Sequence, residues 1–102
     1  MSFKNSKLFF ILSICLYASV SFAQDAEKGK ALYQACIQCH GEQGLGDKAQ
    51  EAPKLSGQFD WYIVSQLNKF KAKERHNPKM YPFIKNLTNK DFEDLAAYIS
   101  KL

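Results

Sequence analysis

The chain has 102 residues, of which 46% are hydrophobic and 24% are charged, and its formal net charge is +4. This length fits a single domain. Without Lys4 and Lys7, which lie in a predicted leader, the net charge falls to +2. A charge this small and the lack of a recognisable nucleic-acid-binding motif exclude nucleic acid as an expected partner.

The first 23 residues have the pattern of a secretory signal peptide. Lys4 and Lys7 give a basic start, and an apolar run follows over residues 8–20. Ser21-Phe22-Ala23 then offers a small-x-small cleavage site before Gln24. We therefore predict a cleaved leader over residues 1–23 and export of the chain to the periplasm.

Two other interpretations of the leader are weaker. An uncleaved membrane anchor needs a longer apolar run than this one. A lipoprotein anchored through Cys15 needs a small residue just before it, where the chain has Ile14. We expect residues 24–102 to form one domain with no stable membrane insertion, although this size is marginal for a core built from side chains alone.

The first predicted helix begins near Asp25. Aspartate is a good N-cap, and the negative charge of Glu27 is favourable in the first turn. The helix is expected to run into a cysteine motif, carrying small and apolar residues on the way: Ala31, Leu32, Ala35 and Cys36.

The segment Cys36-Ile37-Gln38-Cys39-His40 matches CxxCH, the attachment signature of c-type haem. Thiols three positions apart lie on one side of a helical turn, where they can add across the two vinyl groups of one haem. The histidine that follows lies beneath the iron. The motif predicts one haem c held covalently by Cys36 and Cys39, with His40 as the proximal iron ligand.

Other chemistry for this motif fits less well. A structural zinc site lacks a second Cys/His pair at finger spacing. A thioredoxin-like redox motif needs a βαβ pattern, and no strands are predicted nearby. A disulfide between Cys36 and Cys39 leaves His40 unexplained.

The chain after the motif alternates between loop and helix. Residues 41–57 are rich in glycine and polar residues, which is loop composition. A middle helix is predicted from about Asp60, with Ile63, Leu67 and Phe70 at helical spacing. A last helix is predicted to start at Thr88, which stands at capping-box spacing from Asp91, while Leu87 and Phe92 are placed as a hydrophobic staple. Its apolar face consists of Phe92, Leu95, Ala96 and Ile99.

Residues 76–82 lie between the last two helices and contain Pro78 and Pro82, which exclude a continuous helix and favour extended backbone. Met80 is the only methionine after the leader, and its thioether is placed to reach the sixth position of the iron. We predict Met80 as the distal iron ligand. His76 is the rival, and bis-histidine ligation lowers the potential relative to His/Met ligation.

The second half of the sequence carries a cluster of basic residues. Glu74 is the only acidic residue among them, and such a cluster is either a solvated face or a docking surface for an acidic partner. The members are Lys69, Lys71, Lys73, Arg75, Lys79 and Lys85.

The ordered set of motif residues over residues 25–102 resembles the class I c-type cytochromes, in particular short bacterial monohaem proteins and the halves of dihaem cytochromes. A late methionine and an Ala-Ala-Tyr sequence in the last helix make the resemblance specific for class I. The residues that carry it are Gly29, Tyr33, Cys36, Cys39, His40, Gly41, Pro53, Leu55, Gly57, Gln58, Tyr62, Gln66, Leu67, Phe70, Met80, Leu95, Ala96, Ala97 and Tyr98.

The resemblance implies an all-α cytochrome c fold of three to four helices around one covalently attached haem. It implies that Gly29 allows a close approach of the last helix, that the Pro53 carbonyl accepts from the His40 ring, and that Trp61 and Arg75 contact the haem propionates. Residues 47–51 are charged and depart from the family pattern.

Taken together, these features predict a soluble periplasmic electron carrier, not an enzyme, that shuttles one electron between a membrane or periplasmic donor and a terminal oxidase or reductase. Redox protein partners are expected to dock at the exposed haem edge, with no small-molecule substrate. The alternatives are a dedicated cytochrome subunit of one redox enzyme complex, or a haem-based ligand sensor or peroxidase.

Overall fold

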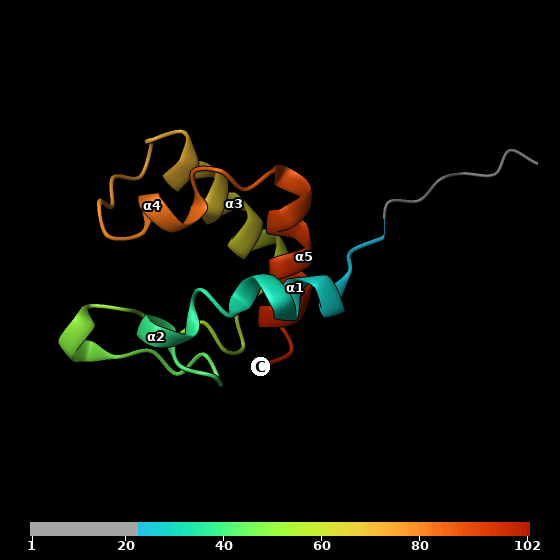
Figure 1. Ribbon diagram of the computed structural model, residues 1–102, viewed down its shortest axis with the longest axis horizontal. Coiled ribbons are helices and arrows are strands. Elements are labelled where there is room, and N and C mark those ends of the chain that lie inside the picture. The colour runs from blue at the N-terminus through green and yellow to red at the C-terminus, as the bar shows by residue number, and fades with distance from the viewer. Residues whose placement is uncertain (1–22) are drawn as a thin grey trace, which may run out of the picture.

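The computed structural model describes residues 23–102, where five α-helices and one short 3₁₀-helix are joined by loops (Figure 1). The predicted leader lies outside the described residues except for Ala23. Among residues 23–102 there is no strand, only an isolated antiparallel bridge between Asp47 and Ala52. The prediction of an all-α fold is confirmed. The helices are α1 (Ala26–Tyr33), α2 (Ile37–His40), η1 (Lys48–Gln50), α3 (Asp60–Lys71), α4 (Tyr81–Ile84) and α5 (Asn89–Ile99).

The caps of the terminal helices form as their sequences predict. The Asp25 carboxylate accepts hydrogen bonds from the backbone N–H groups of Glu27 and Lys28, each at 3.1 Å. At the start of α5, the Thr88 side chain accepts from the Asp91 N–H while the Asp91 side chain accepts from the Thr88 N–H. An aspartate therefore completes this capping box in place of the usual glutamate or glutamine.

The apolar faces of α3 and α5 meet in one core, and α5 also packs along α1 (Figure 1). The spacing of apolar residues in the sequence correctly identified the buried positions of α3 and four of those of α5. Asp94 and Ala97 are also buried in α5 and were not predicted. The core consists of Tyr33, Ile63, Leu67, Phe70, Ile84, Phe92, Leu95, Ala96 and Ile99.

Two short helices differ from the sequence-based expectation. The first helix ends at Tyr33, and a turn separates it from α2, which carries all of the cysteine motif except Cys36. Extended backbone was expected around Pro82, but Tyr81–Ile84 forms one helical turn with that proline in its first positions. Proline fits there because the first N–H groups of a helix have no partner within it.

The crossing of α1 and α5 depends on Gly29. A Cβ atom at this position would lie 1.9 Å from the backbone oxygen of Asp94, so only glycine fits. One turn further along, the rings of Tyr33 and Tyr98 pack with their centroids 5.4 Å apart. This is the close approach that the family resemblance implied.

Asp94 is a fully buried carboxylate at the same crossing. It accepts a hydrogen bond of 2.8 Å from the Asp25 N–H, pairs with Lys90, and lies 3.8 Å from the Lys28 ammonium. Burial disfavours the charged form, but Lys90 and the Asp25 N–H outweigh it and hold the pKa of Asp94 below its ordinary value. The carboxylate thus ties the start of α1 to α5.

Gly29→Ala tests the crossing by the sign of its effect. On helix propensity alone the change stabilises by roughly 1 kcal/mol. Because the new Cβ meets backbone, we expect a loss of about 3 kcal/mol in the free energy of unfolding instead. Denaturant titration of the purified protein measures this, with Ala31→Gly on the exposed face of α1 as a control that costs roughly 1 kcal/mol. A stabilised Gly29→Ala protein would show that the helices do not approach this closely.

Asp94→Asn tests the buried carboxylate through pH. Since the pKa of Asp94 is lowered in the folded protein, its stabilising effect is present above the ordinary value of 3.8 and is lost as the pH falls through the folded-state pKa. We expect Asp94→Asn to be less stable than wild type at pH 7, with a difference that shrinks towards about pH 2. A difference that stays constant across this range contradicts the assignment.

Candidate functional site

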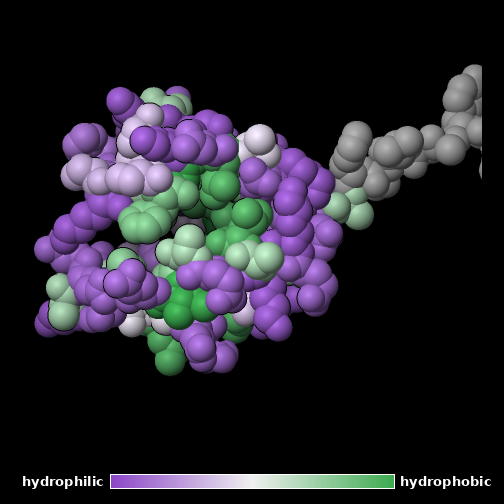
Figure 2. Space-filling model, in the orientation of Figure 1, coloured by the Kyte–Doolittle hydropathy of each residue, from purple (hydrophilic) through white to green (hydrophobic). Residues whose placement is uncertain are grey.

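A cavity of about 1100 Å³ opens into the core between α2 and α4. Figure 2 shows hydrophobic residues gathered around a hollow on this face, and Figure 1 shows α2 and α4 on the two sides of it. All four residues predicted to bind haem line this one cavity: Cys36, Cys39, His40 and Met80. Most of the remaining wall is apolar and includes Leu55, Ile63, Leu67, Phe70, Phe83, Ile84, Leu95 and Ile99.

The residues present fit a large, flat, apolar metal cofactor. The volume is slightly above the usual range for ligand cavities, and the larger part of the wall is apolar. Two thiols, an imidazole and a thioether come together on it. The thiols are groups to which a haem can be attached, and the imidazole and the thioether are ligands of haem iron.

His40 is held in one orientation. Its side chain is only 5% exposed, and Nδ1 lies 2.8 Å from the Pro53 carbonyl oxygen. Since a carbonyl can only accept, Nδ1 carries the proton and donates it there, which leaves the lone pair of Nε2 free for a metal. A carbonyl partner of this kind fixes the tautomer and raises the basicity of a ligating imidazole. The Pro53 contact implied by the family resemblance is present.

The two cysteines are half-buried, and no disulfide joins them. Cys36 stands just before α2, and its carbonyl accepts from the His40 N–H at 2.9 Å, which closes the turn that brings the motif together. Burial, followed by the neighbouring Cys39, raises the pKa of the Cys36 thiol to about 11. This thiol is therefore protonated at neutral pH.

The charged loop after the motif contacts Cys39 through Gln50, a residue that the sequence analysis missed. The Gln50 side-chain oxygen lies 3.1 Å from the Cys39 sulfur. Its Nε2 donates to the Gln38 carbonyl at 3.0 Å and to the Asp47 carboxylate at 3.1 Å. Asp47 also accepts from the Ala49 N–H and so caps η1, a local signal that was readable in the sequence.

Met80 and its rival His76 both line the cavity, but their settings differ. Met80 is half-buried and packs against the hydrophobic core, whereas His76 is exposed. Of the two residues suggested for the propionates, Arg75 lines the cavity. Trp61 does not, since it is 66% exposed and stacks on Phe59 outside the cavity.

The basic cluster is spread over more than one surface. Arg75 and Lys79 line the cavity, and Lys79 forms an ion pair of 3.5 Å with Glu51 on the other loop. Lys71, in contrast, contacts the Leu87 carbonyl beyond α3. Of this cluster, only Arg75 and Lys79 therefore stand where a partner at the cavity would meet them, and Lys54, outside the cluster, lines the cavity as well.

Three features are absent from the part of the chain that the structure describes. Within residues 23–102, no group of three or more His, Cys, Asp or Glu side chains is arranged to hold a metal ion. The same part of the chain has no βαβ unit. Across these residues no helix is both long enough and apolar enough to cross a membrane.

Comparison with known proteins identifies the family. The family model for cytochrome c matches residues 26–102, and the chain belongs to this family. Membership implies a covalently attached haem c.

Three related proteins illustrate the range of lengths. Cytochrome c-552 from Acidithiobacillus ferridurans is 38% identical over 86 residues, which cover 76% of this chain and 36% of that protein. Cytochrome c-554(548) from Halomonas halodenitrificans is 33% identical over 76% of this chain and 96% of that protein. The crystal structure of reduced cytochrome c4 from Pseudomonas stutzeri superposes with a TM-score of 0.71 and 32% identity, covering 76% of this chain and 47% of that one. The chain thus spans less than half of cytochrome c-552 and of cytochrome c4.

Proposed function

We propose that this protein is a one-electron carrier of the periplasm, with one haem c bound through Cys36 and Cys39 and its iron ligated by His40 and Met80. The observation that carries the proposal is the single apolar cavity on which the two thiols, the imidazole and the thioether all lie. Haem c, when bound, supplies an iron that takes up and releases one electron.

The residues around the cavity have distinct tasks in this proposal. The Pro53 carbonyl holds the proton of His40 on Nδ1, so that Nε2 remains a neutral, well-oriented donor. The Met80 thioether is a soft ligand that favours the reduced iron. The apolar wall disfavours the additional positive charge of the oxidised iron. Both effects raise the reduction potential among c-type cytochromes.

Two permanent axial ligands leave no position for a substrate, and for this reason we propose a carrier, not an enzyme. A gas sensor or a peroxidase needs a ligand that leaves readily or a vacant sixth position. The packing of Met80 against the core cluster supports a ligand that stays bound.

Partners are proposed to dock at the mouth of the cavity. Arg75 and Lys79 line it, so the surface presented to a partner is apolar with a basic margin. An acidic redox protein complements such a surface, and charges at the margin act mainly on the rate of association. Electron carriers of this kind bind through small, short-lived interfaces.

Replacement of the two candidate distal ligands tests the proposal. We expect wild type to show the weak red charge-transfer band of Fe(III)–methionine sulfur and to bind carbon monoxide poorly. Met80→Ala should abolish the band, admit carbon monoxide to the reduced protein and lower the potential. Met80→His should restore a low-spin six-coordinate iron at a lower potential, because the thioether is lost.

His76→Ala is the matched control and should leave the band and the potential unchanged. Absorption spectra of both oxidation states, with and without carbon monoxide, provide the readout. The proposal is wrong about the distal ligand if wild type lacks the band and the potential responds to His76→Ala but not to Met80→Ala.

A further inference from the structure

The loop that carries Met80 has little regular structure of its own. It connects the end of α3 at Lys71 to the start of α4 at Tyr81, and residues 71–76 are all exposed. Exposed loops with few buried contacts open easily. Something must therefore fix the backbone of Met80 if its sulfur is to be a permanent ligand.

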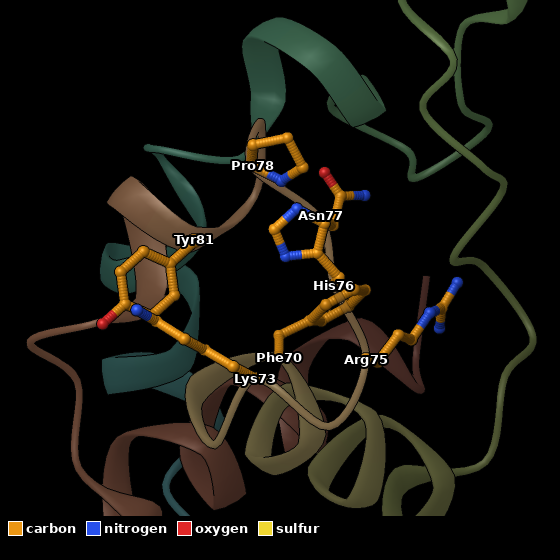
Figure 3. A pocket seen from close by; sticks show the side chains of 7 residues that line it. All are labelled: Phe70, Lys73, Arg75, His76, Asn77, Pro78 and Tyr81. Atoms are coloured by element: carbon orange, nitrogen blue, oxygen red, sulfur yellow. The ribbon is translucent and has the colours of Figure 1, made fainter.

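The α3 end of this loop is anchored by side-chain contacts in which Met80 takes no part. The Arg75 guanidinium lies 4.5 Å from the Phe70 ring centroid and donates to Gln66 at 2.8 Å. The Lys73 ammonium lies 4.9 Å from the ring centroid of Tyr81. A second, smaller pocket lies against this part of the loop, and Figure 3 shows Lys73 and Arg75 pointing to different sides of it, with His76 between them. None of these contacts reaches the backbone of Met80.

Asn77 makes the contacts that do. Its side-chain oxygen accepts hydrogen bonds from the backbone N–H groups of Lys79 at 3.0 Å and Met80 at 3.2 Å. Its carbonyl oxygen accepts from the Tyr81 N–H at 3.0 Å. The side chain is half-buried, and Figure 3 shows it next to Pro78 on the loop.

This arrangement is that of a helix N-cap. An asparagine whose oxygen accepts from the N–H groups two and three residues further on satisfies donors that a helical turn leaves without partners. Pro78 follows at the first position of the turn, where its fixed φ and missing N–H are favourable. Met80 thus lies at the third position of a capped turn that continues into α4.

We propose that Asn77 is the positioning residue for Met80: its side-chain oxygen holds the Met80 backbone so that the thioether stays directed into the cavity. The inference rests on the proposed function, because it gives Asn77 a role only if Met80 ligates iron. Asn77 lines the cavity, but its proposed action is on the Met80 backbone and not on the iron. It acts by keeping the methionine-off state rare.

The expected size of the effect follows from helix capping. Losing an N-cap side chain typically shifts a local equilibrium about fivefold. The rate at which imidazole replaces methionine on Fe(III), measured at saturating imidazole, reports the rate at which Met80 leaves. Asn77→Ala should raise this rate about fivefold and weaken the red charge-transfer band at alkaline pH, with haem content unchanged.

Two further variants separate capping from other effects. Asn77→Ser retains a capping oxygen and should return the imidazole rate to within about twofold of wild type, since serine caps as well as asparagine. Asn77→Gln keeps the amide but moves its oxygen one methylene away, and should behave like alanine. It also serves if Asn77→Ala does not accumulate with haem attached.

Two control variants test for an effect of global stability. One is Ala31→Gly on α1, far from the loop in sequence, and the other is Asn86→Ala, which changes an exposed asparagine after α4. Ala31→Gly should lose about as much stability as Asn77→Ala, and neither control variant should change the rate at which imidazole replaces methionine. Asn77→Ala and Asn77→Gln rates equal to wild type, with the methionine band present in all three, overturn the inference while leaving the proposed function intact. Absence of the band from wild type overturns both.

Discussion

The feature on which the rest of the structure depends is a cavity placed inside the hydrophobic core instead of beside it. Six core residues also form its wall: Ile63, Leu67, Phe70, Ile84, Leu95 and Ile99. Protein interiors are packed as densely as organic crystals, and an apolar hollow of about 1100 Å³ removes the contacts that normally hold a small domain together. A group that fills the hollow therefore completes the core. In this account the chemistry of Cys36 and Cys39 is also a folding device, because attachment at these positions keeps the filling group in place.

The two sides of the cavity are held by very different means. On the α2 side, His40 is buried, is bonded to the Pro53 carbonyl, and lies next to a turn that the Tyr33 hydroxyl fixes by donating to the Gly41 carbonyl at 2.7 Å. Burial raises the pKa of Tyr33 to about 12, so this donor keeps its proton throughout the physiological range. On the α4 side, Met80 belongs to a largely exposed loop. We infer that the α2 side stays fixed while changes in ligation, where they occur, begin on the α4 side.

Sequence reasoning succeeded where the determinants are local and failed where they are not. The N-cap at Asp25, the capping box at Thr88 and the buried faces of α3 and α5 follow from spacing along one segment, and CxxCH is itself a local motif. The reach of Gln50 to the Cys39 sulfur joins side chains eleven positions apart, and the burial of Asp94 depends on a contact with the first helix. Neither is visible to periodicity.

The central claim is that one haem is attached covalently through both cysteines of the motif, and intact-mass spectrometry under denaturing conditions tests it most directly. The protein is produced in a host that matures c-type cytochromes and is compared with Cys36→Ser and Cys39→Ser variants. The account predicts a wild-type mass equal to residues 24–102 plus one haem that survives unfolding, because thioether bonds do not break on denaturation. It predicts that each single variant loses one of the two links, and that a variant with both changes releases the haem. A wild-type mass equal to the bare polypeptide would contradict the account.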